Sequence, residues 1–201
     1  MTPEKFYKDK LDEKSEVKRL GWNSPKDQQI NFAVGIEIIE SKFALAGTSV
    51  HDAGCGHGDL LPHLRKRGIE KYVGTDFMEE PLVIAREAHK DANGGTEKVR
   101  FERLELRTDK LPQVDVTFVF GALAFHTGKD GERMLKRLYD ASKLALVFHS
   151  WWDIDKSYVN YTESTQMQKR IERFLQDKSH VARIRNYGVA REAMFGVFKR
   201  H

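Results

Sequence analysis

The chain has 201 residues, 40% hydrophobic and 32% charged, and carries a formal net charge of +4. These values suit one globular domain. No apolar run approaches the roughly 20 residues that span a bilayer, and the charged first residues lack the apolar core of a signal peptide, which argues against a membrane segment. The single cysteine, Cys55, excludes an internal disulfide and fits a reducing compartment, so we expect a cytoplasmic protein.

The positive charge is concentrated near the end of the chain. From Glu163 onward there are nine Lys or Arg and four Asp or Glu, a balance of +5, so the remainder is near −1. Such a segment favours an anionic partner such as nucleic acid. The simpler interpretation is a solvated helix and edge strands, and we favour it because no nucleic-acid motif accompanies the charge.

The first 47 residues predict a helical cap or lid. Residues 3–18 alternate charged and apolar positions, which predicts a short amphipathic helix. After a break at "GWNSP", Ser24 is a good N-cap, Pro25 suits the first helical position and Asp27 the third. Apolar residues then recur at helical spacing, and we expect Gly47 to end this second helix.

From residue 48 to 201 the pattern alternates between strands and helices. Strands are expected at 49–53, 71–76, 99–105, 114–120, 144–149, 181–187 and 193–199, and helices at 59–67, 79–92, 130–142 and 162–176. Only a few residues separate the last two strands, so these form an antiparallel hairpin. The sequence therefore predicts an α/β fold: a Rossmann-like, doubly wound, seven-stranded sheet that is mostly parallel, in one domain over residues 1–201.

The first strand of this sheet runs into a glycine-rich turn, "HDAGCGHGDL" at residues 51–60. In an open α/β sheet this turn is the usual anchor for a ligand. The dinucleotide fingerprint G-x-G-x-x-G would put a third glycine where this chain has Asp59. An acid there opposes a pyrophosphate, so NAD is disfavoured.

The second strand ends in "YVGTDF", with Asp76 22 residues after Gly54. A carboxylate at this point accepts hydrogen bonds from the ribose hydroxyls of a nucleoside. Phe77 follows it and is placed to lie against the base. The alternative for Asp76 is a turn or helix-capping aspartate, and the spacing to the glycine turn favours the ribose.

With these features the sequence resembles the class I S-adenosylmethionine-dependent methyltransferases. The resemblance rests on "HDAGCGHGDL", "GTDF", "VRFERLEL" and "VDVTFVFGAL". The flanking segments "LGWNSPKDQQINF" and "HVARIRNYG…EAMFGVFKR" resemble a branch of small, mostly uncharacterised methyltransferases, so the likeness covers nearly the whole chain. It implies S-adenosylmethionine as cofactor and methyl transfer as activity.

The resemblance also implies which residues hold the cofactor. Gly54 and Gly56 let its methionine part approach the backbone, Asp52 lies near its ammonium group, and Asp76 holds the ribose. The family's adenine-facing aspartate is replaced by Glu105, with the backbone amide of Leu106 as the alternative contact. The full set of expected cofactor contacts is Asp52, Ala53, Gly54, Cys55, Gly56, Asp76, Phe77, Glu105, Leu106, Phe120, Gly121, Gln28 and Trp22. The family's arginine before the phenylalanine of the opening signature is Asn31 here, which leaves Gln28 as the better-matched polar residue.

Candidate catalytic and pocket residues follow the fourth and fifth strands. His126 and His149 are possible bases near neutral pH, and we name His126 as the catalytic candidate from its position alone. Trp151 and Trp152 either wall an acceptor pocket or pack a loop. The histidines around Cys55 straddle a strand and a tight turn, so no metal site is expected.

Methyl transfer from a sulfonium needs mainly proximity and alignment, so no catalytic triad is expected. The turn "FGALAF" lacks the Asn/Asp-Pro-Pro-aromatic pattern of enzymes that methylate exocyclic amines in nucleic acid. The only cysteine lies in the cofactor turn, which excludes cytosine C5 chemistry. A small molecule, or else a protein, is the expected acceptor. Two alternatives stay open: a regulatory protein that binds the cofactor without turnover, and an NAD-dependent oxidoreductase.

Overall fold

The structure, a computed structural model, describes residues 5, 20, 22–90, 98–125, 128–152, 161–187 and 190–200. The helix expected over 3–18 lies outside the described residues, apart from Lys5. Among the described residues, no helix is both long enough and apolar enough to cross a membrane.

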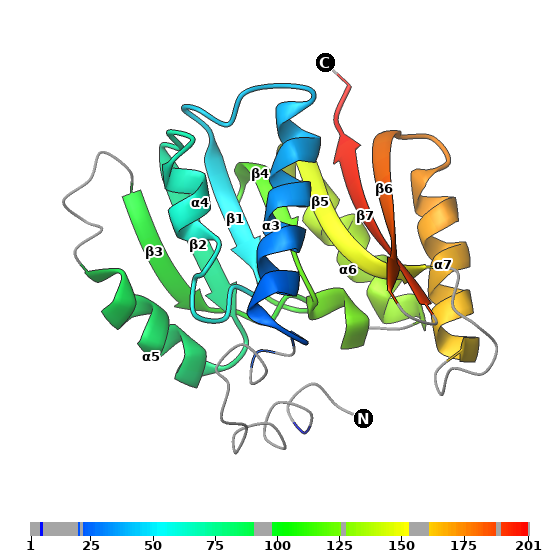
Figure 1. Cartoon of the computed structure of the whole chain (residues 1–201), viewed down its shortest axis with the longest axis horizontal. Helices are drawn as coiled ribbons and strands as arrows, with labels where there is room; N and C mark the ends of the chain where they lie inside the picture. The colour runs from blue at the N-terminus through cyan, green and yellow to red at the C-terminus, as the bar shows by residue number, and fades with distance from the viewer. Residues whose placement is uncertain are drawn as a thin grey trace.

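The core of the fold is one seven-stranded sheet (Figure 1). Its strands are β1 (Ser49–Ala53), β2 (Lys71–Asp76), β3 (Lys98–Arg103), β4 (Val114–Val119), β5 (Ser142–Trp152), β6 (Ser179–Tyr187) and β7 (Ala190–Phe198). The strand order is β3-β2-β1-β4-β5-β7-β6. Strands β1 to β5 are parallel, and β7 pairs antiparallel with both β5 and β6. The fold class expected from the sequence is confirmed.

Helices cover both faces of this sheet. They are α3 (Pro25–Glu40), α4 (Leu61–Arg65), α5 (Glu79–Ala88), α6 (Gly128–Ala141) and α7 (Tyr161–Leu175), with a 3₁₀ turn, η2, at Ala122–Phe125. One apolar cluster joins α3, α4 and α5 to the face that is nearer the viewer in Figure 1, and a second joins α6 and α7 to the opposite face. Alternate strand residues supply the two clusters, as in a sheet that is buried on both sides.

Helix α3 begins as the sequence predicts. Ser24 is extended, and its hydroxyl accepts a hydrogen bond from the Asp27 backbone N–H at 3.1 Å, with Pro25 in the first turn. The expected end at Gly47 is wrong, because α3 ends at Glu40. The Ser41 hydroxyl donates to the Ile38 carbonyl, and Gly47, with φ of +73°, instead forms the turn into β1.

Other boundaries differ for local reasons. Helix α4 begins at Leu61 rather than residue 59, since Pro62 has no N–H to donate and belongs in a first helical turn. Helix α5 ends at Ala88 rather than residue 92. Strand β5 continues to Trp152 because β7 runs beside it over its whole second half, a pairing that the local pattern of β5 does not reveal.

The topology fixes where a ligand binds. Strand β1 pairs with β2 on one side and with β4 on the other. The order in which successive strands are added to the sheet therefore reverses at β1. In an open sheet of parallel strands, the crevice beyond the carboxyl ends at this switch point is the usual ligand site. The glycine turn after β1, Asp76 after β2 and Gly121 after β4 all lie at this edge.

Candidate cofactor and acceptor site

The glycine turn after β1 needs glycine for two reasons. Gly54, Gly56 and Gly58 have φ of +80°, +54° and +76°, a left-handed region that other residues rarely adopt. Space is also short. A Cβ would lie 3.0 Å from the Ala122 Cβ at Gly54, and 2.9 Å from Leu20 Cδ2 at Gly56. At Gly58 it would lie 2.7 Å from the Phe101 ring.

Backbone hydrogen bonds tie this turn to β2. The N–H groups of Gly54 and Cys55 both donate to the Thr75 carbonyl, at 2.7 and 2.9 Å. The Gly56 N–H donates to the Asp76 carboxylate at 3.1 Å. The turn is therefore held in place by hydrogen bonds to the neighbouring strand.

Asp76 joins the turn to the next helix. Its second carboxylate oxygen accepts from the Met78 backbone N–H at 3.0 Å, at the start of α5. Burial raises the pKa of Asp76 above its ordinary value, and hydrogen bonds from Met78, Gly56 and Phe77 oppose that rise. A carboxylate has about four acceptor positions, so these bonds leave capacity for a ligand hydroxyl. The sequence alternatives for Asp76, capping and ribose binding, are thus compatible.

Asp52, two residues before the turn, is a buried acid. It is 4% exposed, and the Tyr72 hydroxyl donates to it at 2.6 Å. Burial is the main cause that raises the pKa of Asp52 to about 7; Asp59 and Asp76 raise it further, and the Tyr72 hydrogen bond opposes them. Near neutral pH, Asp52 is therefore about half protonated, and a nearby cation favours its ionised form.

Asp59 completes an acidic set around the turn. The Gln28 side-chain amide on α3 donates to the Asp59 carboxylate at 2.9 Å. Gln28, expected to contact the cofactor, therefore reaches the turn through Asp59. Three carboxylates around one glycine turn suit a cationic ligand such as a sulfonium or an ammonium group, and they oppose a pyrophosphate. The cradle fits S-adenosylmethionine better than NAD.

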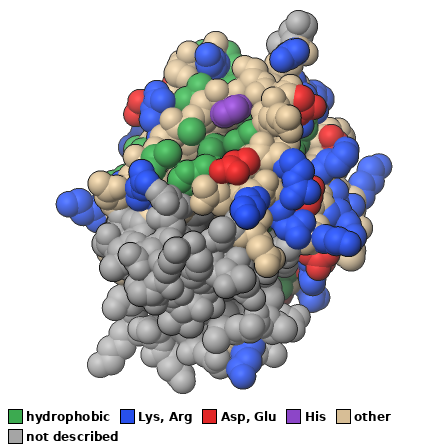
Figure 2. Space-filling model, turned by 90° about the vertical axis from the view of Figure 1, so that its right-hand side faces the viewer, with side chains coloured by type: hydrophobic (Ala, Val, Ile, Leu, Met, Phe, Trp, Pro, Cys, Tyr) green, Lys and Arg blue, Asp and Glu red, His purple; other side chains and the backbone are tan. Residues whose placement is uncertain are grey.

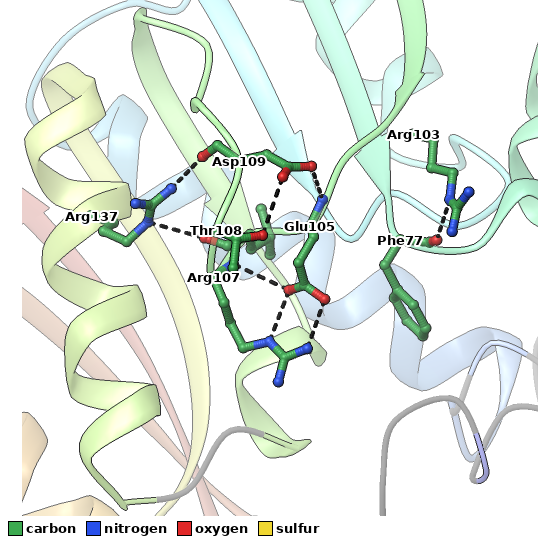
Figure 3. A network of polar contacts seen from close by, with 8 residues as sticks. Phe77, Arg103, Glu105, Arg107, Thr108, Asp109 and Arg137 are labelled. Atoms are coloured by element: carbon green, nitrogen blue, oxygen red, sulfur yellow. Dashed lines mark hydrogen bonds and ion pairs between the residues drawn. The ribbon is translucent and has the colours of Figure 1, made fainter.

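The segment after β3 holds its acid in a local network (Figure 3). The Glu105 carboxylate accepts from Arg107 Nε at 3.0 Å and Nη2 at 2.9 Å, and the Arg107 backbone N–H also donates to it. The Glu105 N–H donates to Asp109, while Arg137 donates to the Asp109 and Leu106 carbonyls. Glu105 is therefore engaged by Arg107, and the side chain of Leu106 is buried.

Phe77 is anchored beside this network. Its carbonyl accepts from Arg103 Nε at 3.1 Å, which links the residue after β2 to the end of β3 (Figure 3). The Phe77 side chain is half-buried. It follows Asp76 directly, where a base attached to a bound ribose would extend.

The end of β4 combines a packed ring with an open backbone. The Phe120 ring packs against Phe32 and Phe118 at centroid distances of 5.5 and 5.7 Å and is 7% exposed. Gly121 has φ of +82°, and no described heavy atom lies within 4 Å of where its Cβ would stand. Phe120 can therefore offer only main-chain atoms to a ligand, and the space beside Gly121 is open among the described residues.

The segment before α3 supplies a contact that sequence reasoning missed. Leu20 packs against the glycine turn at Gly56, and Trp22 packs edge-on against Phe32 at 6.0 Å. No local pattern marks Leu20, since the contact joins it to a turn more than 30 residues further along the chain. Tyr72 was missed for a similar reason: its bond to Asp52 joins residues on different strands.

The histidine and tryptophan candidates fall into different places. His126 lies outside the described residues. His149 is 8% exposed, with its Nε2 3.5 Å from Glu192, which also pairs with Arg185 across β6 and β7. Burial pushes the pKa of Glu192 up, but His149 and Arg185 outweigh it and leave the pKa below its ordinary value. Trp152 packs against Phe195 at 5.1 Å, so its ring is part of the core.

The residues around Cys55 do not converge. His51 is buried, and its Nε2 lies 2.8 Å from the Thr75 hydroxyl. Burial, assisted by the charge of Arg100, lowers the pKa of His51 to about 3. The Cys55 thiol is also buried, which raises its pKa. Within the described ranges, no group of three His, Cys, Asp or Glu is placed to hold a metal ion.

Comparison with known proteins agrees with this geometry. Residues 50–144 match the sequence family described as a methyltransferase domain. No curated protein sequence matches the chain at a significant level.

Solved structures share the fold over nearly the full chain. Magnesium protoporphyrin IX methyltransferase (ChlM) from Synechocystis PCC 6803, with bound SAH, superposes with a TM-score of 0.70 at 16% identity, covering 98% of this chain and 100% of that one. A SAM-dependent methyltransferase from Aquifex aeolicus gives a TM-score of 0.62 at 18% identity, covering 92% and 99%. At such identities the likeness is one of fold.

The fold is Rossmann-like, and the crevice at the β1 switch point is its expected ligand site. The match of residues 50–144 to a methyltransferase domain, and the fold shared with S-adenosylmethionine-dependent methyltransferases, agree with the resemblance seen in the sequence.

Proposed function

We propose that this protein transfers the methyl group of S-adenosylmethionine to a small-molecule acceptor that enters beside the end of β4. The observation that carries the proposal is the cradle of Gly54 and Gly56 between the buried carboxylate of Asp52 and the half-buried carboxylate of Asp76. This cradle suits a ligand with a cationic methionine end and a nucleoside end.

Each expected contact has a role in this proposal. The main chain from Ala53 to Gly56 lies along the methionine part, and Asp52 faces its ammonium group. Asp76 accepts from the ribose hydroxyls with the acceptor capacity left by Gly56 and Met78. Phe77 lies against the adenine. Because Arg107 engages the Glu105 carboxylate, we assign the adenine contact mainly to the Leu106 amide.

The chain's own groups do little covalent chemistry. When bound, the cofactor supplies an electrophilic methyl on a good leaving group. The main chain at Phe120 and Gly121 positions the reacting end, and the acidic set orients the cationic groups. Alignment of the acceptor is then the main contribution to rate. If the methyl acceptor must lose a proton, His126 is the general base that we propose. His149 is a weaker choice because it is buried.

We infer a lid from the N-terminal segment. Leu20 packs on Gly56, and Trp22 packs on Phe32 of α3, so this segment meets the cofactor turn from outside the sheet. Residues 1–47 thus form a cap over the core at 48–201, with Gln28 and Trp22 near the methionine end. A covering segment of this kind excludes water from the reacting groups.

The acceptor class rests on two observations. The described helices and strands all belong to one sheet and its covering layers, and the open space beside Gly121 is local to the strand edge. The structural neighbour ChlM is named for a porphyrin substrate, which shows that this fold accommodates a small-molecule acceptor in another protein. The single cysteine suits a reducing compartment, and on that ground we propose a cytoplasmic enzyme.

Calorimetry tests the cofactor first. The full chain should bind S-adenosylhomocysteine, with no comparable heat from NAD⁺ or NADH. Transfer of labelled methyl from S-adenosylmethionine to a fractionated small-molecule extract then tests turnover. Cofactor binding without any labelled product in either small molecules or macromolecules would favour a regulatory protein, and tighter binding of NAD⁺ would overturn the assignment.

A further inference from the structure

A groove lies between α6, α7 and the outer ends of β6 and β7. Its volume is about 830 Å³. Seven cationic side chains line it, against three carboxylates. The cations are Lys129, Arg133, Lys136, Arg173, Lys178, Lys199 and Arg200, and the carboxylates are Glu132, Asp140 and Asp177. Lys and Arg side chains gather on the right-hand part of Figure 2, the side of the molecule that carries α6 and α7.

The groove follows α6 for most of its length. Lys129, Arg133, Lys136 and Asp140 recur at helical spacing along one side of the helix. Eleven residues of α-helix extend about 16 Å. Phosphates of a stacked strand repeat at about 3.4 Å, so this row has room for roughly four or five of them.

Several of the cations are not neutralised locally. Lys136 pairs with Asp140, Lys178 with Asp177, and Arg133 lies 3.6 Å from Asp130. Glu132 forms an ion pair with Arg170, which does not line the groove. Within the described part of the chain, no ion pair involves Lys129, Arg173, Lys199 or Arg200. The wall therefore keeps a positive excess.

Aromatic rings hold two of the cations in position. The Lys199 ammonium lies 4.0 Å from the centre of the Tyr139 ring, and the Lys178 ammonium lies 4.8 Å from that of Phe174. Cation–π contacts fix such groups without cancelling their charge. The lysines are thus presented as ordered donors, whereas free surface lysines must lose side-chain entropy on binding.

From this arrangement we propose that the α6–α7 groove binds the phosphodiester backbone of a nucleic acid. A membrane surface fits less well. The large hydrophobic side chains that are exposed among the described residues are Val83, Ile84 and Ile184, and none of them lines the groove. The rings of Tyr139 and Phe174 are covered by ammonium groups, so the groove reads phosphates and not bases.

Fluorescence anisotropy with a labelled 20-nucleotide RNA of mixed sequence tests the proposal on the full chain. Binding should weaken steeply with salt, with a slope near −3 in a plot of log K against log salt if about four phosphates are neutralised. The charge-reversal pair Arg133→Glu/Arg173→Glu should weaken binding at least tenfold. Both positions are exposed, so the fold should tolerate the change.

The matched control is Lys66→Glu/Lys98→Glu. It changes net charge equally at exposed lysines on α4's end and on β3, away from the groove, and should change affinity less than twofold. The neutral pair Arg133→Gln/Arg173→Gln covers the case in which charge reversal disturbs α6. Calorimetry with S-adenosylhomocysteine on every variant checks folding and keeps this test separate from the cofactor assignment.

Competing polyanions decide what the groove recognises. Unlabelled DNA of equal length should compete about as well as RNA, since both carry phosphodiesters. The proposal is overturned if RNA does not bind, if both charge-reversal pairs weaken binding equally, or if poly-glutamate or vesicles of phosphatidylserine and phosphatidylcholine displace RNA as well as DNA does.

Discussion

The two charged regions of this molecule are built in opposite ways. Around the glycine turn, Asp52 is buried and bonded to Tyr72, Asp76 is half-buried and bonded to backbone N–H groups, and both have raised pKa values. Along the α6–α7 groove the charges are mostly cationic and mostly exposed, and only some of the cations are paired at the surface. Exposed charges are screened by salt, whereas charges shielded from water are screened much less and interact more strongly. The first region is suited to one small ligand in one orientation, and the second to a polymer held by many weak contacts.

The largest expected effect comes from filling the turn. Gly58→Ala adds a Cβ that would lie 2.7 Å from the Phe101 ring at φ of +76°. Left-handed strain and overpacking together should lower the free energy of unfolding by about 2–4 kcal/mol. Urea denaturation with and without S-adenosylhomocysteine measures both stability and binding.

Gly47→Ala is the matched control for Gly58→Ala. Its φ of +73° is nearly the same, but no heavy atom of the described residues lies within 4 Å of the added Cβ. It should cost about 1 kcal/mol and leave cofactor affinity unchanged. Equal losses at both glycines would show that crowding around the turn contributes nothing.

Replacing Asp76, the acid at the end of β2, should distinguish a role in ligand binding from a role in holding the start of α5. Asp76→Ala deletes the acceptor for the Gly56 and Met78 N–H groups and, on our proposal, for the ribose. A charge-assisted hydrogen bond is worth about 1.5–3 kcal/mol, so affinity for S-adenosylhomocysteine should fall at least tenfold by calorimetry.

Asp115→Ala provides the comparison for Asp76→Ala. Asp115 also accepts from a backbone N–H and a hydroxyl, both of Ser49, but at the opposite end of β1. It should lower stability and spare binding. An unchanged Kd in Asp76→Ala would show that Asp76 only holds the turn and the start of α5.

The raised pKa of Asp52 predicts a pH dependence of binding. With a pKa of about 7, the carboxylate is mostly protonated at pH 6 and mostly ionised at pH 8. An ammonium group favours the ionised form, so affinity for S-adenosylmethionine should rise roughly tenfold over this range. Asp52→Asn keeps an acceptor for Tyr72 and should remove the dependence. If Asp52→Asn shows the same pH dependence of affinity, that dependence comes from another titrating group.

The ionisation of Asp52 that should strengthen cofactor binding should also lower the stability of the folded protein. Because the folded-state pKa of Asp52 lies above its ordinary 3.8, the ionised carboxyl opposes folding, increasingly as pH rises from about 4 to 7. Asp52→Asn should therefore raise the melting temperature more at pH 8 than at pH 5. A larger gain at pH 5 would contradict the buried-acid interpretation.

The smallest expected effect concerns the lid. Leu20→Ala removes the side chain that packs on Gly56, at a half-buried position. Cofactor affinity should fall a few-fold, and hydrogen exchange in the neighbouring described residues should slow less on adding S-adenosylhomocysteine than in the wild type. If deletion of residues 1–19 instead causes a large loss of stability, and exchange protection is equal with and without ligand, the segment is a permanent part of the core.

Some parts of the fold were predictable because their causes are local. Ser24, Pro25 and Asp27 start α3 through contacts within one turn, and β2 ends at Asp76 as its apolar run ends. The ends of α3 and α4 were less predictable. Gly47 carries a stop signal in sequence, yet its conformation serves the turn that bonds to Gly68 on another element. Local patterns cannot show such a pairing.

The site divides in the same way. By itself the sequence determined the glycine turn, the acid after β2 and the alternation that makes a doubly wound sheet, since each depends on backbone conformation or on period along the chain. Only the tertiary structure decided that Tyr72 holds Asp52, that Gln28 holds Asp59 and that Leu20 covers Gly56. It also gathered the scattered cations of α6, α7 and β7 into one groove. These contacts join residues far apart in the chain, and their geometry follows from strand order and register, which no short stretch of sequence contains.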